Sequence, residues 1–246
     1  MAAFDNWFKQ RNRNIYQSIY RSIFKEEYPE EADPDGYVTL TDLRNCVKHL
    51  NVEPGDKIID LGCGRGGPGL WIARALDVSY LGLDIAKVGI EWGWKRINNF
   101  GLNGKAEFQV ADIAGNTGLP NNCYDGAISI DTISFIHNNL SVFREIQRIL
   151  QPNARFISTL WEQNRPERVN DYHPLLQKTG FEVILYKETN NWKHYQRKSY
   201  QRVLKLKDKI IEEYGKDGSR GLIYEAEKKL KQLDNMRRVF IVAKKL

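Results

Sequence analysis

Three acidic residues stand at the ends of three short apolar segments of the chain. The segments are residues 57–61, 78–83 and 106–110, and the acids are Asp60, Asp84 and Asp112. A glycine-rich stretch follows the first segment, with Gly62, Gly64, Gly66 and Gly67 ahead of a helix-like run. Such a turn lets the backbone pass close to a ligand, and the first N–H groups of a helix are free to bind an electron-rich group. The pattern predicts a ligand site built by a strand, a turn and a helix.

The spacing of the glycines also satisfies the fingerprint of dinucleotide-binding proteins. Gly62-x-Gly64-x-x-Gly67 matches it, and Asp84 follows at roughly the 20 residues at which an acid binds a ribose hydroxyl. Asp60 argues against a dinucleotide, because its charge would repel a pyrophosphate and would suit a cationic or hydroxyl-bearing ligand. An NAD(P)-dependent oxidoreductase stays open as an alternative. The Tyr224-x-x-x-Lys228 pair also matches that class, although it lies in a charged helical stretch.

The segment Asp60-Leu61-Gly62-Cys63-Gly64-Arg65-Gly66-Gly67 resembles the first motif of class I S-adenosylmethionine-dependent methyltransferases. Its continuation, Gly67-Pro68-Gly69-Leu70-Trp71, resembles bacterial enzymes of this class that methylate small molecules of the natural-product type. The resemblance covers roughly residues 37–187 and a last strand near 238–244. It implies an α/β fold with a doubly wound, Rossmann-like sheet of seven strands. The alternation of short apolar strands with helices along the chain favours the same fold.

By this resemblance the chain binds S-adenosylmethionine through residues at the ends of successive strands. Asp84, with Ile85 beside it, would bind the ribose hydroxyls, because a carboxylate can accept two such hydrogen bonds. Asp112 would accept a hydrogen bond from the adenine amine while the ring packs on Ile113. The other cofactor contacts that the resemblance implies are Asp60, Gly62, Cys63, Gly64, Gly66 and Asp131. The alternative for any one acid is a helix N-cap.

The segment 131–137 follows the predicted fourth strand and, by resemblance, lies next to the transferred methyl group. It holds Asp131 and His137, which together with Glu162 are the predicted catalytic residues. His137 is favoured as the general base, because histidine titrates near neutral pH. The alternatives are that His137 begins the next helix and that Glu162 holds Arg165. The segment lacks the Asp/Asn-Pro-Pro-aromatic sequence of many methyltransferases of nucleobase amines, which argues against nucleic acid as the substrate.

Substrate contacts are predicted from residues near the expected ligand edge and from the segments that flank the core. Tyr16 and Tyr20 belong to an amphipathic helix near the N-terminus. In class I methyltransferases, the segment before the first motif often covers the active site. The predicted set is completed by Trp161 and Glu162, at the tip of the fifth strand, and by Trp192, at the start of a long insertion. Core packing is the alternative for the aromatic residues.

The chain is predicted to form a single methyltransferase domain over residues 1–246. Its parts are an N-terminal helical lid (1–36), a core (37–187), a helical cap inserted before the last strand (188–235) and the last strand (236–246). Expected elements include a helix over 41–50 with Thr41 or Asp42 as N-cap, a fifth strand over 155–160, and cap helices near 192–214 and 222–233. Because long insertions in compact folds tend to be functional, lid and cap are expected to enclose the substrate.

Composition narrows the possible partners. The chain has 246 residues and a net charge of +6, and the part from Lys187 onward holds 17 Lys and Arg against 8 Asp and Glu. A basic surface could attract nucleic acid, but these charges alternate in sign, as on a solvated helix face. Cys46, Cys63 and Cys123 form no C-x-x-C pair, so neither a disulfide framework nor a metal site is expected. No segment resembles a signal peptide or a membrane span, which predicts a cytoplasmic protein without a membrane partner.

We therefore expect an enzyme that transfers a methyl group from S-adenosylmethionine to a small-molecule acceptor of specialised metabolism by in-line displacement. The acceptor atom stays open between oxygen, nitrogen and carbon, and carboxyl methylation is included. The alternatives are methylation of a peptide natural product or of RNA, and NAD(P)-dependent oxidation. A cofactor-binding regulatory module is the non-enzymatic alternative. The sequence makes no prediction of the oligomeric state.

Overall fold

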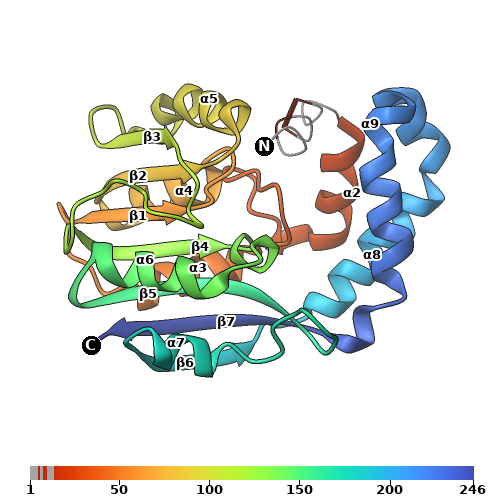
Figure 1. The fold of residues 1–246 in the computed structure, drawn as a ribbon. Coiled ribbons are helices and arrows are strands. Elements are labelled where there is room, and N and C mark those ends of the chain that lie inside the picture. The colour runs from red at the N-terminus through yellow and green to blue at the C-terminus, as the bar shows by residue number, and fades with distance from the viewer. Residues whose placement is uncertain (1–4, 6–7, 10–13) are drawn as a thin grey trace.

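The structure is a computed structural model that describes residues 5, 8–9 and 14–246, and its framework is one seven-stranded sheet (Figure 1). The strands lie in the order β3-β2-β1-β4-β5-β7-β6. β7 runs antiparallel to its neighbours β5 and β6, and the other pairs are parallel. The bounds are β1 Lys57–Leu61, β2 Ser79–Asp84, β3 Ala106–Val110, β4 Tyr124–Ile130, β5 Leu150–Gln163, β6 Phe181–Glu188 and β7 Met236–Lys245. The predicted doubly wound, seven-stranded fold is confirmed.

Helices cover both faces of the sheet. Buried residues of α3 (Leu40–His49), α4 (Gly67–Leu76) and α5 (Lys87–Arg96) belong to the hydrophobic cluster on one face. Those of α6 (Asn139–Ile149) and α7 (His173–Lys178) belong to the cluster on the other face. Short 3₁₀ helices follow α2 (Lys25–Glu27), α5 (Ile97–Phe100) and β4 (Ile133–Phe135), and a fourth precedes β7 (Leu233–Asn235).

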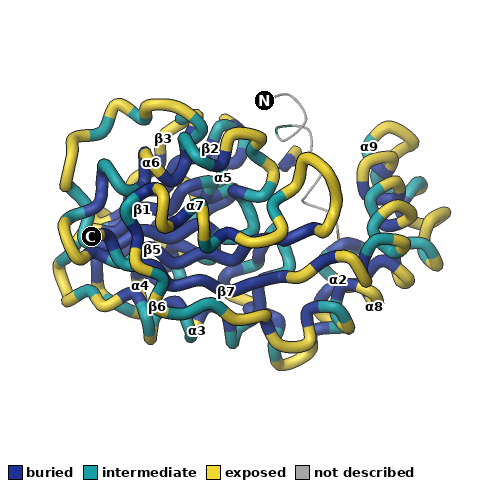
Figure 2. Tube along the Cα trace, turned by 60° about the horizontal axis from the view of Figure 1, so that its bottom comes forward, coloured by how far each residue is buried: buried dark blue, intermediate teal, exposed yellow. Residues whose placement is uncertain are grey.

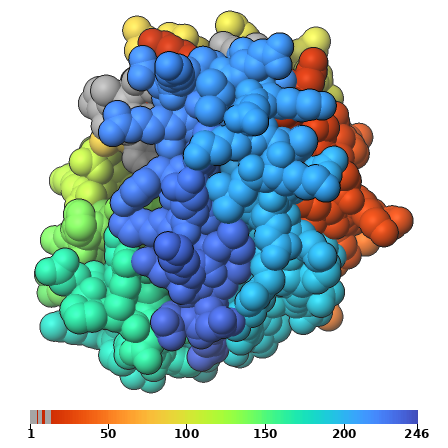
Figure 3. Space-filling view, turned by 90° about the vertical axis from the view of Figure 1, so that its right-hand side faces the viewer, coloured from red at the N-terminus to blue at the C-terminus, as the bar shows by residue number. Residues whose placement is uncertain are grey.

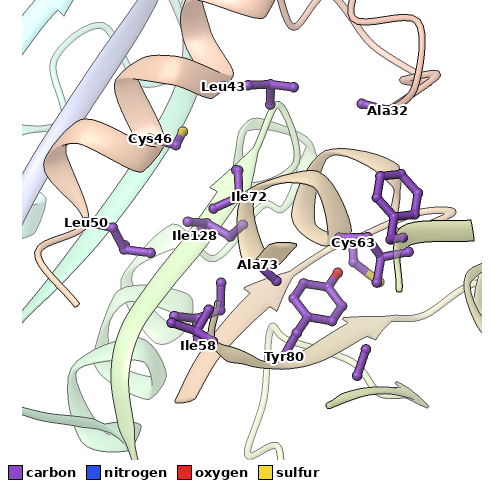
Figure 4. Close-up of a cluster of buried hydrophobic side chains, with 14 of the residues drawn as sticks. Ala32, Leu43, Cys46, Leu50, Ile58, Cys63, Ile72, Ala73, Tyr80 and Ile128 are labelled. Carbon is purple, nitrogen blue, oxygen red and sulfur yellow. The ribbon is translucent and has the colours of Figure 1, made fainter. Parts of the chain in front are cut away.

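Successive residues of the central strands are buried on opposite faces of the sheet. Ile58 of β1 lies in the first cluster and Ile59 in the second. Figure 4 shows the first cluster, with labelled side chains of α3 (Leu43, Cys46), of Leu50 directly after it, of α4 (Ile72, Ala73) and of the strands (Ile58, Tyr80, Ile128). Figure 2 shows the same burial along the trace, where the central strands are dark blue and exposed residues lie on outer helices and loops. Strands covered on both faces read as nearly continuous apolar runs, and this made them visible in the sequence.

A separate group of helices lies beyond the carboxyl ends of the strands. It consists of α2 (Asn14–Phe24), α8 (Trp192–Lys205) and α9 (Lys207–Leu230), and Figure 3 shows α8 and α9 covering this end of the molecule with α2 at their side. Phe24 of α2 stacks on Tyr195 of α8 with ring centroids 4.5 Å apart, and the Tyr214 hydroxyl accepts a hydrogen bond from the backbone N–H of Tyr16 at 3.2 Å. The N-terminal helix and the long insertion therefore form one layer, and their role as lid and cap stays a prediction.

Two predicted helix boundaries differ from the structure. The N-cap of α3 is Thr39, and Asp42 is the third helical residue, whose side chain accepts a hydrogen bond from the Thr39 N–H in a capping box. The expected helix over 192–214 is two helices, because α8 ends at Lys205 and α9 begins at Lys207. Within α9, Gly215 has φ 73° and ψ 167°, so the helical path breaks directly after residue 214, where the first cap helix was expected to end.

The fifth strand is longer than its apolar run suggests. β5 continues to Gln163 through pairing with β7, so that Trp161 pairs with Arg238 and Glu162 with Arg237. Trp161 and Glu162 are thus strand residues with opposite side-chain directions, and not a loop at the strand tip.

In the part of the chain that the structure describes, no helix is both long enough and apolar enough to cross a membrane. Among these residues, no group of histidine, cysteine and acidic side chains is arranged to hold a metal ion. Cys46 and Cys63 are buried free thiols, and Cys123 is partly buried.

Candidate active site

One cavity of about 600 Å³ lies between the strand ends and the helices α2 and α9. One side, the strand-end wall, consists of the residues that line the cavity from four segments, 60–65 with Pro68, 84–85, 111–114 and 130–137, although not every residue of these segments contacts the cavity. The other side, the aromatic wall, is formed mainly by Tyr16, Tyr20, Tyr37, Trp161, Leu222 and Glu225. The cavity brings together most of the predicted site residues: Tyr16, Tyr20, Asp60, Gly62, Cys63, Gly64, Asp84, Ile85, Asp112, Ile113, Asp131, His137 and Trp161.

The glycine-rich turn after β1 has a backbone that only glycine fits. Gly62 has φ 79° and Gly64 φ 56°. A Cβ at Gly62 would lie 2.1 Å from the Thr132 side chain, whose hydroxyl donates to the Gly62 carbonyl at 2.9 Å. Gly66, the N-cap of α4, is outside the cavity lining and packs on Phe108, where a Cβ would lie 2.3 Å away. Gly66 therefore supports the turn instead of contacting a ligand.

Asp84 is oriented by the turn and by the loop after its own strand. Its two carboxylate oxygens accept hydrogen bonds from the backbone N–H groups of Gly64 and Ala86, each at 2.8 Å. Burial raises the pKa of Asp84, and the two backbone hydrogen bonds oppose that shift. Because each oxygen can accept a second hydrogen bond, the carboxylate suits two neighbouring hydroxyls, as in a ribose.

Asp60 lies deeper than Asp84, at the end of β1. Its Oδ2 accepts a hydrogen bond from the Tyr80 hydroxyl at 3.0 Å, and a Cβ at Gly69 would lie 2.4 Å from the same oxygen. Burial raises the pKa of Asp60 to about 7. Burial also raises the pKa of the neighbouring Cys63 thiol, which keeps it neutral and argues against a nucleophilic role.

Asp112, Ile85 and Ile113 line the part of the strand-end wall that the loops after β2 and β3 form. Asp112 Oδ1 accepts a hydrogen bond from the Ala114 N–H at 2.9 Å, so the carboxylate is fixed while its other oxygen stays available to a ligand. Ile113 is buried, Ile85 is partly buried, and both line the cavity. A carboxylate beside two apolar side chains suits an aromatic base with an exocyclic amine.

Asp131 ends β4 in a left-handed conformation, φ 54°, and is held by a residue that sequence reasoning missed. Arg238 of β7 donates from Nε and Nη2 to the two Asp131 oxygens, at 2.9 Å each, and from Nη1 to Asp42 at 2.7 Å. Arg238 is only 1% exposed. An aspartate bound at both oxygens is a poor proton acceptor, so the structure does not favour Asp131 as a catalytic base. The signal in the sequence that could have indicated this contact is Arg238 itself, a basic residue within the apolar run of the last strand.

His137 lies on the loop between β4 and α6 and lines the cavity. It does not begin α6: the N-cap is Asn138, whose side-chain oxygen accepts a hydrogen bond from the Ser141 N–H at 3.2 Å. His137 is exposed, and nearby Phe135 is 62% exposed at the cavity mouth. The imidazole can therefore exchange protons with both a ligand and solvent.

The structure corrects the substrate contacts predicted for Glu162 and Trp192, and with them the catalytic role predicted for Glu162, because neither residue lines the cavity. Glu162 points to the face of β5 opposite Trp161, where it is 3% exposed, accepts a hydrogen bond from the Tyr186 hydroxyl and lies 3.5 Å from Arg237 Nε. No ion pair between Glu162 and Arg165 is present in the described part of the chain. Trp192 packs edge-on against Trp161, with centroids 5.4 Å apart, and donates to Glu188. Trp192 supports the aromatic wall from behind.

The aromatic wall is a continuous cluster of rings with one carboxylate. Ring centroids are 4.4 Å apart for Tyr16 and Tyr20, 5.8 Å for Tyr20 and Tyr37, and 6.0 Å for Tyr37 and Trp161. Glu225 of α9 lines the cavity beside them and accepts a hydrogen bond from the Tyr37 hydroxyl at 3.4 Å. Glu225 was not predicted, because its helix reads as a charged surface.

Comparisons with known proteins agree with this geometry. Residues 52–217 match a family model described as a methyltransferase domain. Phosphoethanolamine N-methyltransferase 1 of Arabidopsis thaliana is 28% identical over 209 residues, which are 76% of this chain and 42% of that protein. An O-methyltransferase of Pyrenophora dematioidea is 32% identical over 157 residues, 61% of this chain and 58% of that protein.

Solved structures share the fold. Phosphoethanolamine N-methyltransferase 2 of Haemonchus contortus, solved in complex with S-adenosylmethionine, superimposes with a TM-score of 0.72 at 19% identity, covering 93% of this chain and 56% of that one. At this identity the likeness shows the fold alone. The chain spans less than half the length of phosphoethanolamine N-methyltransferases 1 and 3 of Arabidopsis thaliana, of which it covers 42% and 43%.

Proposed function

The chain belongs to the methyltransferase-domain family, and from this premise we propose that it transfers a methyl group from S-adenosylmethionine to a small-molecule acceptor. One observation carries the proposal: a single cavity has hydrogen-bond acceptors for an adenosyl group along its strand-end wall and a separate aromatic wall for a second molecule. Its volume of about 600 Å³ lies within the range of roughly 300–1,000 Å³ that is usual for ligand sites.

The residues of the strand-end wall fit the cofactor in shape and charge. Asp84 would hold the ribose hydroxyls, and Asp112 the adenine amine with the base packed on Ile85 and Ile113. When bound, S-adenosylmethionine supplies an electrophilic methyl group on a positively charged sulfur. Asp131 lies on the same wall as Asp84 and Asp112, and this group of acidic side chains favours a cationic ligand over the pyrophosphate of a dinucleotide.

The chain contributes mainly alignment and exclusion of water. Helices α2 and α9 contribute residues to the cavity lining and would exclude water as lid and cap, while the Gly62 to Thr132 contact fixes the turn against the loop that follows β4. Well-oriented reactions reach effective molarities of roughly 10⁵ M or more, so positioning can supply most of the acceleration. His137 would accept the proton of a hydroxyl or ammonium acceptor, which adds roughly 10²- to 10⁴-fold. A carboxylate acceptor would need no base.

The geometry argues against two alternative functions, NAD(P)-dependent oxidation and methylation of RNA. The Tyr224 and Lys228 pair is formed, with Nζ 3.0 Å from the hydroxyl, but Tyr224 is 59% exposed and neither residue is among the described residues of the cavity lining. An oxidoreductase would need that pair at the cofactor. Residues of α2 and α9 form the aromatic wall together with Tyr37 and Trp161, and a second molecule that packs on these rings is expected to be a small acceptor and not a polynucleotide.

Ligand-dependent thermal unfolding tests the proposal. S-adenosylmethionine, S-adenosylhomocysteine and NADH would each be added at about a hundred times the expected dissociation constant, where a bound ligand stabilises the native state by about 2.7 kcal/mol. We expect the midpoint to rise by about 5–10 °C with the two sulfur compounds and to stay constant with NADH. A rise with NADH alone would overturn the proposal.

A further inference from the structure

Glu225 is the charged group of the aromatic wall. It lies three and four residues after Leu222 and Gly221, which also line the cavity, so all three share one side of α9. Its Oε1 accepts hydrogen bonds from the hydroxyls of Tyr200 at 2.9 Å and Tyr37 at 3.4 Å. In the described part of the chain, no Lys or Arg lies within ion-pair distance of Glu225. Glu225 is thus a carboxylate that two hydroxyls hold in place and that has no ion-pair partner among the described residues.

The hydroxyls around Glu225 are themselves held as donors. Gln196 donates to the Tyr200 oxygen at 3.0 Å, which leaves the Tyr200 proton to point at the carboxylate. Burial, followed by the charge of Glu225, raises the pKa of Tyr200 and of Tyr37, so both phenols stay neutral. This network fixes the position of the Glu225 carboxylate at the cavity wall.

The other charges of the cavity do not offer a site for an anion. The described lining residues include six carboxylate side chains and one guanidinium, that of Arg65. Arg65 is paired with Asp33 at 2.6 Å and with Asp35 at 3.0 Å. Among these lining residues there is therefore no unpaired cation for a phosphate or carboxylate of the acceptor, whereas Glu225 offers an unpaired negative charge.

The rings beside Glu225 suit a cation as well. Tyr37 is central, with its centroid 5.8 Å from that of Tyr20, 6.0 Å from Trp161 and 6.1 Å from Tyr200. Aromatic faces attract ammonium groups, most strongly where water is excluded, and Tyr20, Trp161 and Tyr200 are all buried. A carboxylate among aromatic rings is thus a complementary site for an organic ammonium ion.

We propose that the methyl acceptor is an amine without a phosphate group, which binds as its ammonium form between Glu225 and the rings of Tyr37 and Trp161. This inference rests on the proposed function. Before transfer, the ammonium releases one proton to Glu225 or His137 and from there to solvent. The nitrogen lone pair then forms the bond to the methyl carbon, and the pair of the breaking carbon–sulfur bond stays on sulfur. The products are a methylated ammonium and S-adenosylhomocysteine, with charge conserved.

Two probes of nearly equal shape separate charge recognition from shape recognition. Choline and 3,3-dimethylbutan-1-ol differ in one atom, because choline has a quaternary nitrogen where the alcohol has a carbon. Calorimetric titration of each into protein saturated with S-adenosylhomocysteine would compare their dissociation constants. We expect choline to bind at least 10-fold more tightly, and Glu225→Gln to abolish this difference. Phosphocholine is expected to bind more weakly than choline, because no free cation of the described lining meets its phosphate.

The matched control is Glu227→Gln, which changes an exposed carboxylate on the same helix that pairs with Lys207 at 3.4 Å. It should keep the preference for choline. Equal binding of the two probes to the unmodified protein, or tighter binding of phosphocholine than of choline, would overturn the inference. Titration of S-adenosylhomocysteine tests the proposed function separately, and an absence of binding would overturn that function. Choline and 3,3-dimethylbutan-1-ol would then be titrated into the protein without S-adenosylhomocysteine, and their comparison would still decide whether the cation site exists. Unchanged S-adenosylhomocysteine affinity in Glu225→Gln shows that the variant is folded.

Discussion

Arg238 binds both carboxylate oxygens of Asp131 at 2.9 Å, although the two residues are 107 positions apart in the sequence. The contact ties the end of β4, where the cavity begins, to the last strand of the sheet. Asp42 completes the cluster from α3, so that one buried guanidinium orients residues of three elements. The cluster holds two carboxylates against one cation, which leaves a net negative charge beside the strand-end wall.

Replacing Arg238 by methionine should cost about 3–5 kcal/mol of unfolding free energy, because it leaves two buried carboxylates without a partner. Urea unfolding measures the loss. Adding Asp131→Asn to that variant should restore part of it, since one of the two unpaired charges is then removed. Lys244→Met, on the same strand with one partly exposed partner, Glu182, is the control and should cost less than about 1 kcal/mol. A similar small loss for Arg238→Met would contradict this account.

Replacing Asp84 by alanine should abolish measurable binding of S-adenosylhomocysteine. The change removes the acceptor for two ribose hydroxyls, at about 1.5–3 kcal/mol for each hydrogen bond to a charged group, and leaves the N–H groups of Gly64 and Ala86 without their acceptor. Calorimetric titration gives the affinity. Glu107→Gln, an exposed acid on the adjacent strand β3, serves as the control. Unchanged affinity in Asp84→Ala would remove the ribose assignment.

Asp60 should make the protein less stable as the pH rises from about 4 to 7. Burial raises its pKa in the folded protein to about 7, above the ordinary value of 3.8, so the folded state binds a proton that the unfolded state has already lost. Protonated Asp60 therefore contributes its full stabilisation below about pH 4, and this stabilisation is lost as the pH rises through its pKa of about 7 in the folded protein. Relative to the unmodified protein, Asp60→Asn should gain stability by up to about 1.4 kcal/mol per pH unit in this window. Urea unfolding at pH 5, 6, 7 and 8 tests the slope, and parallel pH profiles of the two proteins would contradict it.

Gly62→Ala should weaken both folding and cofactor binding. The added Cβ meets the Thr132 side chain at 2.1 Å, and the backbone φ of 79° is unfavourable for alanine. Gly104→Ala isolates the backbone effect, because φ is 75° there and a Cβ would meet nothing within 4 Å. We expect about 1 kcal/mol for Gly104→Ala and a clearly larger loss for Gly62→Ala, measured by thermal unfolding. Thr132→Ala should relieve part of the clash in the double variant; equal losses for the two glycines would show that the clash is absent.

His137→Gln should lower turnover by roughly 10²-fold or more while S-adenosylhomocysteine still binds, provided that the acceptor must lose a proton. Steady-state rates with the acceptor, next to a binding titration, separate the two effects. Full turnover in this variant would remove His137 from the site. His194→Gln, a change on α8 outside the described cavity lining, is the matched control.

The parts of the site that were predictable are those whose position follows from local sequence. Asp60, Asp84 and Asp112 each follow or end an apolar strand, and parallel strands bring their carboxyl ends to one edge, so the three acids had to meet. The glycines of the turn were recognisable by spacing. For the same reason the bounds of β3, Ala106–Val110, agree with the predicted segment 106–110, and β4 ends at Ile130, directly before the segment 131–137 that was expected to follow it.

The parts that were not predictable depend on distant contacts. Arg238 and Asp131 share no local pattern, and Glu225 lies in a helix whose alternating charges read as a solvated surface. Glu162 was misplaced because β5 was expected to end at Leu160. Its extension to Gln163 comes from pairing with β7, and the period of two along a strand then directs Glu162 away from Trp161.

The place of β7 in the sheet has a consequence for synthesis on the ribosome. β7 inserts between β5 and β6, yet it follows both in the chain, so β5 keeps an open edge until residues 236–245 have emerged. Open strand edges are the positions at which nascent chains pair wrongly with one another. Arg238 belongs to β7, so its positive charge reaches Asp42 and Asp131 only when β7 pairs with its neighbours and completes the sheet. A nascent chain that lacks residues 236–245 therefore has neither the complete sheet nor the Arg238 contact that orients Asp131.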